Sequence, residues 1–415
     1  MPEVIVLGAG IIGVSTALHL RRRGHDVLLI DRKAPGQETS YGNAGIIQAE
    51  GIRPRAFPRS FADLWTTAIG GRLDTRYELA ALPALADPFL RYWRNSAPDR
   101  YEQIVRDYTP LIRRAVADHS ELIDEAGAQA LIRKQGWMLI FRTEAARDRA
   151  FRLADEKYAP VGVGYRKLDA AALTRAEPDM RERLAGALHW TDPWTVTDPG
   201  GLVAAYAALF EGLGGRFERG EVFSIEPHGA GWRVRGTAGD LTASRVVVAM
   251  GPWSGRLVAP LGYKMPLFAK RGYHMHYGMQ PGTALRNWLL DIEVGYLISP
   301  MQRGARLTTG AEFARPGSSP HHGQIDGTEA VARKLLPLAE RRDPEPWLGT
   351  RPCTPDMKPI IGPAPRHSGL WLAFGHAHHG FTLGPTTGRL LAEAISGQKT
   401  SEDLRPFLPD RFLRG

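Results

Sequence analysis

Residues 4–31 read VIVLGAGIIGVSTALHLRRRGHDVLLID, and this stretch decides the fold. It opens with an apolar run that is typical of a strand buried on both faces of a sheet. A helical pattern then ends at RRRG, residues 21–24, where cations in a last turn and a following glycine are ordinary stop signals. A second apolar run, at residues 27–30, ends at Asp31. We therefore expect a strand, a helix and a second, parallel strand.

Gly8, Gly10 and Gly13 lie where the first strand gives way to the helix. In this spacing the first glycine permits a tight turn, the second lets the backbone approach a pyrophosphate, and the third lets the helix pack on the strand. Amides at the helix start then face the phosphates. Asp31 can accept hydrogen bonds from a ribose diol and would repel a 2′-phosphate, which disfavours NADP. The pattern predicts a dinucleotide site of Rossmann type, with FAD and NAD as alternatives and a glycine turn without ligand as the remaining interpretation.

The composition indicates a globular chain of two or three structural units. Of its 415 residues, 43% are hydrophobic and 23% are charged. Lysine and arginine number 53 against 44 acidic residues, a net charge of +9 that suits a solvated surface, an anionic substrate or an anionic membrane. Because the basic residues are spread out with no interleaved aromatic stripe, no nucleic-acid partner is expected.

The cysteine content and the N-terminal sequence indicate the cellular compartment. The single cysteine, Cys353, supports neither a disulfide framework nor a cysteine-based zinc site. The N-terminus lacks the pattern of a signal peptide, and no apolar run approaches the roughly 20 residues that span a bilayer. We expect a cytoplasmic protein, with peripheral contact at the inner face of the membrane through residues 53–72 as a hypothesis.

The rest of the chain alternates between helical and strand patterns without an internal repeat. We expect helices within 61–155, at 202–213, 328–341 and 385–395, strands at 136–141, 222–225, 232–234, 246–249 and 370–373, antiparallel sheet over 264–315 and a connection at 185–200.

Several segments together resemble the FAD-dependent amine and D-amino acid oxidoreductases, and bacterial D-amino acid dehydrogenases most closely. After GAGIIG at 8–13 they are, in order, TSYGNAG at 39–45, Asp198-Pro199, VVVAMGPWS at 246–254, RPCTPD at 351–356, and Gly375-His376 with Gly380, Gly384 and Gly388. No later segment is specific by itself, but the ordered set covers residues 4 to about 397.

The resemblance implies an α/β fold: a Rossmann-type (GR2-like) FAD-binding domain with an inserted α+β substrate domain that contains an antiparallel sheet. We expect the FAD-binding domain at 1–60, 145–260 and 345–415, and the substrate domain at 61–144 and 261–344. The expected cofactor-binding residues are Gly8, Gly10, Ile11, Ile12, Gly13, Asp31, Arg32, Ser40, Asn43, Ala44, Gly45, Ile46, Val222, Gly251, Trp253, Gly375, His376, Gly380, Phe381 and Thr382.

Arg351 is the best candidate for a substrate residue. A guanidinium grips a carboxylate through two parallel hydrogen bonds, and the resemblance implies an arginine of this segment over the flavin. Tyr273 and Tyr296 are candidates for a second bond to the carboxylate, with core packing as the alternative for each, and His379 is a candidate for approach to the substrate.

The mode of flavin attachment is also implied by the resemblance. Related sarcosine oxidases attach flavin to a cysteine whose position falls on Gly349 here, not on Cys353, so noncovalent FAD is expected. A metal site in the histidine-rich turn at 376–379 is the less favoured interpretation of that segment, and none is predicted.

The implied reaction is oxidative deamination of a D-amino acid or of a cyclic imino acid such as D-proline or D-hydroxyproline. Hydride passes from the substrate Cα to flavin N5, and electrons pass on to a quinone or another carrier. The alternatives are a glycine- or sarcosine-type oxidase that uses oxygen, an NAD-dependent dehydrogenase, and a nonenzymatic flavin-binding or RNA-modifying subunit.

Overall fold

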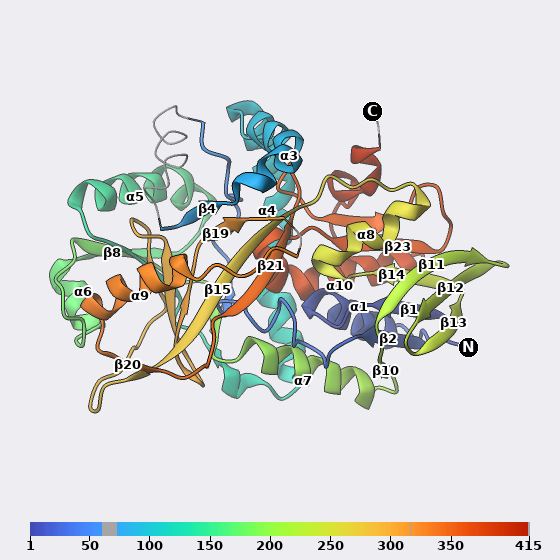
Figure 1. Ribbon diagram of the computed structural model, residues 1–415, viewed down its shortest axis with the longest axis horizontal. Helices are drawn as coiled ribbons and strands as arrows, with labels where there is room; N and C mark the ends of the chain where they lie inside the picture. The colour runs from blue at the N-terminus through green and yellow to red at the C-terminus, as the bar shows by residue number, and fades with distance from the viewer. Residues whose placement is uncertain (60–72, 316, 414–415) are drawn as a thin grey trace.

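The computed structural model describes residues 1–59, 73–315 and 317–413. Two sheets lie side by side in Figure 1: a six-stranded sheet on the side where the N-terminus lies, and an eleven-stranded sheet on the other side. The chain passes between them repeatedly, so each is built from segments far apart in the sequence. The functional consequence is that residues from both sheets meet at their junction.

The six-stranded sheet confirms the predicted Rossmann-type unit. Its order is β10 (Arg216–Arg219), β2 (Val27–Asp31), β1 (Val4–Leu7), β14 (Arg245–Val248), β23 (Leu370–Phe374) and β22 (Ile360–Pro363). Neighbouring strands are parallel except for the last pair, in which β22 runs against β23. Carboxyl ends of parallel strands share one edge, which is where nucleotides bind in sheets of this kind.

Alternation along β1 explains the layers on the two faces of this sheet. Val4 and Val6 face a core shared with the helices α1 (Ile11–Arg22), α4 (Pro98–Glu125), α7 (Pro199–Gly212) and α10 (Gly380–Ile395). Ile5 and Leu7 face the opposite core, closed by α8 (Ser254–Val258) and a small sheet of β11 (Val222–His228), β12 (Gly231–Gly236) and β13 (Gly239–Ala243). A strand apolar at every position is required because both faces are covered.

The large sheet contains the predicted antiparallel region. Its order is β4 (Thr75–Tyr77), β19 (Ala311–Phe313), β15 (Phe268–Met279), β18 (Gly304–Thr308), β17 (Tyr296–Met301), β16 (Leu289–Asp291), β6 (Trp137–Phe141), β8 (Gly186–Trp190) and β7 (Tyr165–Asp169). The strands β20 (Leu338–Arg341) and β21 (Trp347–Cys353) also pair with β15, so this long strand organises the sheet.

Helices and a small sheet complete the second half. The remaining elements are α3 (Leu82–Asn95), α5 (Glu144–Lys157), α6 (Ala170–Ala176), α9 (Gly323–Leu335) and the three-stranded sheet of β3 (Ile46–Ile47), β9 (Trp194–Val196) and β5 (Ile132–Arg133). The helices α6 and α9 pack on one face of the large sheet and α5 packs on the other, and in Figure 1 all three lie in the half of the molecule away from the N-terminus.

Strand pairing departs from the expected domain bounds. Residues 145–260 are expected with the nucleotide sheet, yet β7 and β8 pair within the large sheet, and so does β21 from 345–415. Conversely, α4 belongs to the expected substrate part but packs in the core of the nucleotide sheet. The expected connection at 185–200 contains β8 and β9. The division into domains therefore stays a proposal, with these segments moved.

The end of α9 and the start of α10 also differ from the sequence expectation, and a proline is involved at each boundary. α9 ends at Leu335, before Pro337, and residues 338–341 form β20 instead of helix. α10 begins at Gly380 and contains Pro385. A proline inside a helix frees the carbonyl four residues earlier, and the Phe381 carbonyl accepts a hydrogen bond from His119 Nε2 at 3.0 Å. The freed acceptor is thus satisfied from α4.

Candidate active site

A cavity of about 1420 Å³ lies at the junction of the two sheets. Its walls include the glycine turn after β1, the end of β2, the loop at 38–51, and the turn before α10. Strands of the large sheet supply the remaining wall, among them β15, β17 and β21. The cavity therefore connects the predicted dinucleotide site with the predicted substrate residues.

The glycine turn leaves no room for side chains. A Cβ on Gly8 would lie 2.5 Å from the Ala249 carbonyl oxygen, and one on Gly13 would lie 1.7 Å from the Gly8 carbonyl oxygen. The Ile11 amide is held by Ser40 Oγ at 3.0 Å. These contacts bring the first turn of α1 against the cavity, where its amides can meet phosphate oxygens. The geometry fits a dinucleotide.

Acidic and aromatic side chains line the cavity beside β2. The Asp31 carboxylate accepts hydrogen bonds from the amides of Ala9 at 2.7 Å and Lys33 at 3.0 Å, which fixes it at the strand end. Arg32 pairs with Glu38 at 2.7 Å, and its guanidinium carbon lies 4.4 Å from the ring centre of Trp253. Carboxylate oxygens have lone pairs beyond those two bonds, so Asp31 retains capacity for a ribose diol.

The loop at 40–46 is tied to both sheets. Asn43 Oδ1 accepts from the Gly45 amide at 2.8 Å, and Trp288 Nε1 donates to the Ala44 carbonyl at 2.9 Å. Thr382 on α10 bridges this loop, since its hydroxyl accepts from the Gln48 amide at 3.2 Å and donates to the Ile46 carbonyl at 3.3 Å. These hydrogen bonds fix the loop at the cavity wall. The small residues of the loop leave room for a flat flavin ring beside it.

The turn before α10 contributes buried, neutral imidazoles. His376 Nε2 lies 3.0 Å from Thr387 Oγ1, and His379 Nδ1 lies 2.9 Å from the Tyr108 hydroxyl. Burial lowers the pKa of each of these two histidines to about 3. Between them, Ala377 has a φ of 51°, a left-handed conformation that non-glycine residues seldom adopt. The described residues contain no cluster of histidine, cysteine and carboxylate groups able to hold a metal.

Most predicted cofactor residues line this cavity. Three do not: Gly13 packs against β1, Gly45 packs against the Val196 carbonyl, and Thr382 bridges loop and helix. Those that do are Gly8, Gly10, Ile11, Ile12, Asp31, Arg32, Ser40, Asn43, Ala44, Ile46, Val222, Gly251, Trp253, Gly375, His376, Gly380 and Phe381.

Arg351 projects into the same cavity from β21. Its Nη1 donates to the Gly310 carbonyl at 3.0 Å, and among the described residues it forms no ion pair. Gly272 on β15 makes room for it, because a Cβ there would lie 2.8 Å from Arg351 Nη2. A guanidinium held by one neutral acceptor keeps donors for a carboxylate.

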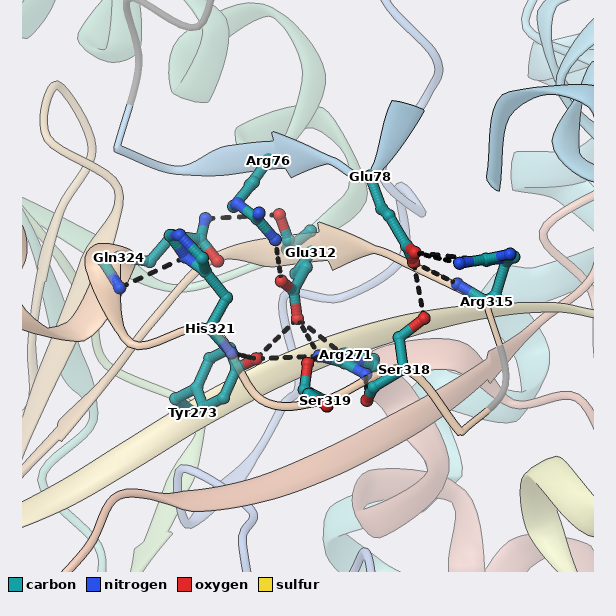
Figure 2. A network of polar contacts seen from close by, with 12 residues as sticks. Arg76, Glu78, Arg271, Tyr273, Glu312, Arg315, Ser318, Ser319, His321 and Gln324 are labelled. Carbon is teal, nitrogen blue, oxygen red and sulfur yellow. Dashed lines mark hydrogen bonds and ion pairs between the residues drawn. The ribbon is translucent and has the colours of Figure 1, made fainter. Parts of the chain in front are cut away.

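The structure gives Tyr273 and Tyr296 other roles than the predicted ones. Tyr273 contributes to the cavity wall, but its hydroxyl donates to Glu312 Oε2 at 2.6 Å and accepts from Arg271 and from the His321 amide (Figure 2). Tyr296 is fully buried in the core of the large sheet and does not line the cavity. Of the predicted substrate residues, Arg351 and His379 remain in place.

Glu50 is a cavity residue that sequence reasoning misses. Its Oε1 accepts from Gln48 Nε2 at 2.9 Å and from Trp137 Nε1 at 3.1 Å, while Oε2 is buried without a partner. Burial raises the pKa of this carboxyl to about 7. No sequence pattern marks it, because the burial comes from Trp137 on a distant strand.

Lys270 is a second missed residue, because alternation along β15 identifies it only once the register with β21 is known. It lines the cavity, whereas Arg271, the next residue, points to the other face of β15 and pairs with Glu312 at 2.7 Å. Alternation along a strand sends neighbours to opposite faces. If Arg351 faces the cavity, its register partner on β15 faces the cavity too. That partner is Lys270, and the sequence does not show this pairing.

Comparison with known proteins agrees with this geometry. The sequence model of the family described as FAD dependent oxidoreductase (DAO) matches residues 3–394. A D-amino-acid oxidase of Bradyrhizobium diazoefficiens is 31% identical and is covered, like this chain, over 100% of its length. A D-amino acid dehydrogenase of Chromohalobacter salexigens is 31% identical, with 97% of each chain covered.

Solved structures show the same fold. Glycine oxidase from Geobacillus kaustophilus superposes with a TM-score of 0.75 at 24% identity and 98% coverage of each chain. Iminodiacetate oxidase from Chelativorans sp. BNC1 superposes with a TM-score of 0.73 at 23% identity, also over 98% of each chain.

Proposed function

Because the chain belongs to the family of FAD-dependent oxidoreductases, we propose that it oxidises a D-amino acid or a cyclic imino acid at Cα. The observation that carries this proposal is Arg351, a guanidinium without an ion pair among the described residues, in the cavity that also contains the dinucleotide turn. The names of the curated relatives, a D-amino-acid oxidase and D-amino acid dehydrogenases, support the substrate class.

In the proposed mechanism, Arg351 binds the substrate carboxylate and so orients the Cα–H bond. The glycine turn, Asp31 and the loop at 40–46 would hold FAD without a covalent bond, and the bound flavin would supply the hydride acceptor. The sole cysteine, Cys353, donates its thiol hydrogen to the Arg351 carbonyl at 3.7 Å, and burial raises its pKa, which disfavours the thiolate.

Glu50 is the group we propose for the substrate proton. The amine must be neutral before hydride leaves, and Glu50 lines the cavity and has a buried Oε2 without a hydrogen-bond partner. The aromatic residues Trp137, Tyr158 and Trp190 line the cavity with it and reduce access of water. The imino product is released and hydrolyses, or persists as a cyclic imine when the substrate resembles proline.

An anaerobic substrate screen tests the proposal. Purified holoenzyme is mixed with D- and L-enantiomers of amino acids and proline derivatives, and loss of the visible flavin absorbance is followed. We expect reduction by D-enantiomers with little by the L-forms. Reduction by none of the D-amino acids or proline derivatives would refute the proposal.

For the electron acceptor we propose a quinone or another carrier, with oxygen as the alternative. One of the relatives above is named an oxidase and the other a dehydrogenase, so the comparison supports either. A reduced enzyme that reoxidises faster with a soluble quinone analogue than with air fits the carrier. Stoichiometric peroxide in aerated turnover would favour the oxidase.

Peripheral membrane contact remains part of this proposal. None of the described helices has the length and apolar character needed to cross a membrane. Residues 60–72 of the predicted contact segment lie outside the described residues, and Arg53 is paired with Glu102 at 2.6 Å. Exposed Leu90 and Trp93 on α3, near Arg91 and Arg94 in sequence, support a surface contact. Failure to float with anionic vesicles would remove it.

A further inference from the structure

Two cations stand directly opposite each other in the wall of the cavity. Lys270 on β15 and Arg351 on β21 are register partners in an antiparallel pair, and both line the cavity. Side chains so placed lie on one face of the sheet, with Cβ atoms about 4.5–5.5 Å apart, and like charges there repel each other. Such a pair lowers the stability of the fold unless an anion binds between the two cations.

Neither cation has an acidic partner among the residues that the structure describes. Arg351 donates to the Gly310 carbonyl, and the Lys270 ammonium has one long hydrogen bond, 3.4 Å to the Tyr92 hydroxyl. Lys270 Nζ lies 4.9 Å from the Tyr92 ring centre and 5.7 Å from those of Phe268 and Phe313. Aromatic faces hold the ammonium in place without cancelling its charge.

Four further arginines line the same cavity, and three of them pair with carboxylates. Arg32 pairs with Glu38 at 2.7 Å, Arg53 with Glu102 at 2.6 Å and Arg55 with Asp74 at 3.4 Å, whereas Arg256 lies on α8, away from the pair on β15 and β21. A substrate with a single carboxylate would compensate Arg351 and leave the half-buried Lys270 uncompensated. Two anionic groups on one substrate would compensate both cations.

We propose that the substrate is an amino acid with two carboxylates, the α-carboxylate on Arg351 and the second on Lys270. This inference rests on the proposed function and narrows its substrate class. The second carboxylate belongs either to an acidic side chain or to a carboxyalkyl group on the nitrogen, since both present the same anion beside the α-carboxylate. Lys270 is then the residue that sets specificity.

Matched substrates test the proposal in the holoenzyme. Three acid and neutral pairs are D-glutamate with D-glutamine, D-aspartate with D-asparagine, and iminodiacetate with sarcosine. We expect the acid of at least one pair to reduce the flavin with a kcat/KM about tenfold or more above its neutral partner, because a charged hydrogen-bond partner is lost in the latter. The pair that responds identifies the source of the second carboxylate.

Variants at Lys270 separate specificity from packing. Lys270→Met should lower kcat/KM for the acid about tenfold or more and so abolish the preference for the acid, and Lys270→Arg should retain that preference. Lys264→Met is the matched control, because Lys264 is an exposed lysine shortly before β15, and it should behave as wild type.

Calorimetric titration gives a readout independent of turnover. Succinate should bind wild-type holoenzyme about tenfold or more tightly than butyrate, and Lys270→Met should lose that difference.

Three results would overturn the inference: wild type that prefers the neutral member of every pair, Lys270→Met that slows acid and neutral substrates equally, or equal affinity for succinate and butyrate. If no amino acid reduces the flavin, the proposed function fails instead, and the succinate comparison still decides whether Lys270 belongs to a dicarboxylate site.

Discussion

The two faces of β15 carry basic residues in opposite situations. On one face, Arg271 is saturated: it pairs with Glu312 at 2.7 Å and donates to the Ser318 and Ser319 carbonyls at 2.6 and 3.0 Å (Figure 2). On the other face, Lys270 and the opposing Arg351 have no acidic partner among the described residues. A buried cation whose donors are all satisfied holds the fold together, whereas one with donors to spare is available to a ligand.

The paired face should respond to mutation with a loss of stability. Glu312 has no exposed surface and binds Arg271, Tyr273 and Arg76, so Glu312→Gln leaves two guanidinium groups facing each other. We expect unfolding free energy to fall by roughly 3–5 kcal/mol in denaturant titration, with kcat per bound flavin retained. Glu78→Gln is the control, because Glu78 pairs with Arg315 at the edge of the same network and should have a smaller effect. Equal effects of the two would contradict the distinction.

The unpaired face should respond with a loss of activity. Arg351→Met removes the carboxylate anchor, and we expect kcat/KM to fall by the equivalent of roughly 2–4 kcal/mol while FAD content and stability stay near wild type. Steady-state kinetics with the best substrate from the screen measure this change. Kinetics indistinguishable from wild type would remove Arg351 from the site.

Gly272→Ala tests the position of Arg351 without touching its charge. The added Cβ would meet the far end of the Arg351 side chain, 2.8 Å from Nη2, so the arginine can move but leaves its place. We expect KM to rise about tenfold, about 1.4 kcal/mol, with little change in unfolding midpoint. Gly212→Ala has nothing within 4 Å of the new Cβ and should leave KM unchanged. An unaltered KM in Gly272→Ala would indicate that Arg351 binds from another rotamer.

Glu50 extends the comparison to an acidic group, with the smallest expected effect. Because burial raises its pKa from 4.5 to about 7, ionised Glu50 accumulates as the pH rises through about 7, and kcat/KM should rise over that window. Glu50→Gln should lack this limb and keep the one that arises from the substrate ammonium. A profile identical to wild type would exclude Glu50 as the proton acceptor.

The same raised pKa has a consequence for stability that needs no substrate. The folded chain binds the Glu50 proton more tightly than the unfolded chain, so this contribution is full below pH 4.5 and is lost as the pH rises towards 7. The unfolding midpoint of wild type relative to Glu50→Gln should therefore fall across that range.

The fold is predictable from the sequence where all of the determining residues lie within a short segment. The β1–α1–β2 unit was predictable because glycine spacing, helix stop signals and strand composition all lie within residues 4–31. The pairing of β7 and β8 with the large sheet was not, since it depends on contacts with β6 that no local pattern encodes.

For the site, the cofactor side was more predictable than the substrate side. Glycines 8 and 10 have a chemical reason in the sequence itself, whereas the roles of Tyr273 and Lys270 depend on which face of β15 each side chain occupies. That information lies in the register with β21, set by residues far along the chain. Charge type alone could not separate Arg271 from Arg351.

The place of β1 in its sheet also affects how the chain is made. β1 lies between β2, which follows at once, and β14, which begins at Arg245, and the cavity wall is completed by the turn before α10 at Gly380. At roughly 5–20 residues per second, a ribosome needs some tens of seconds between the first strand and the last wall. Until β14 has been made, β2 is the partner strand that β1 has, and the nucleotide crevice is incomplete until the turn before α10 has been made. A complete cofactor site therefore exists only after nearly the whole chain has been made.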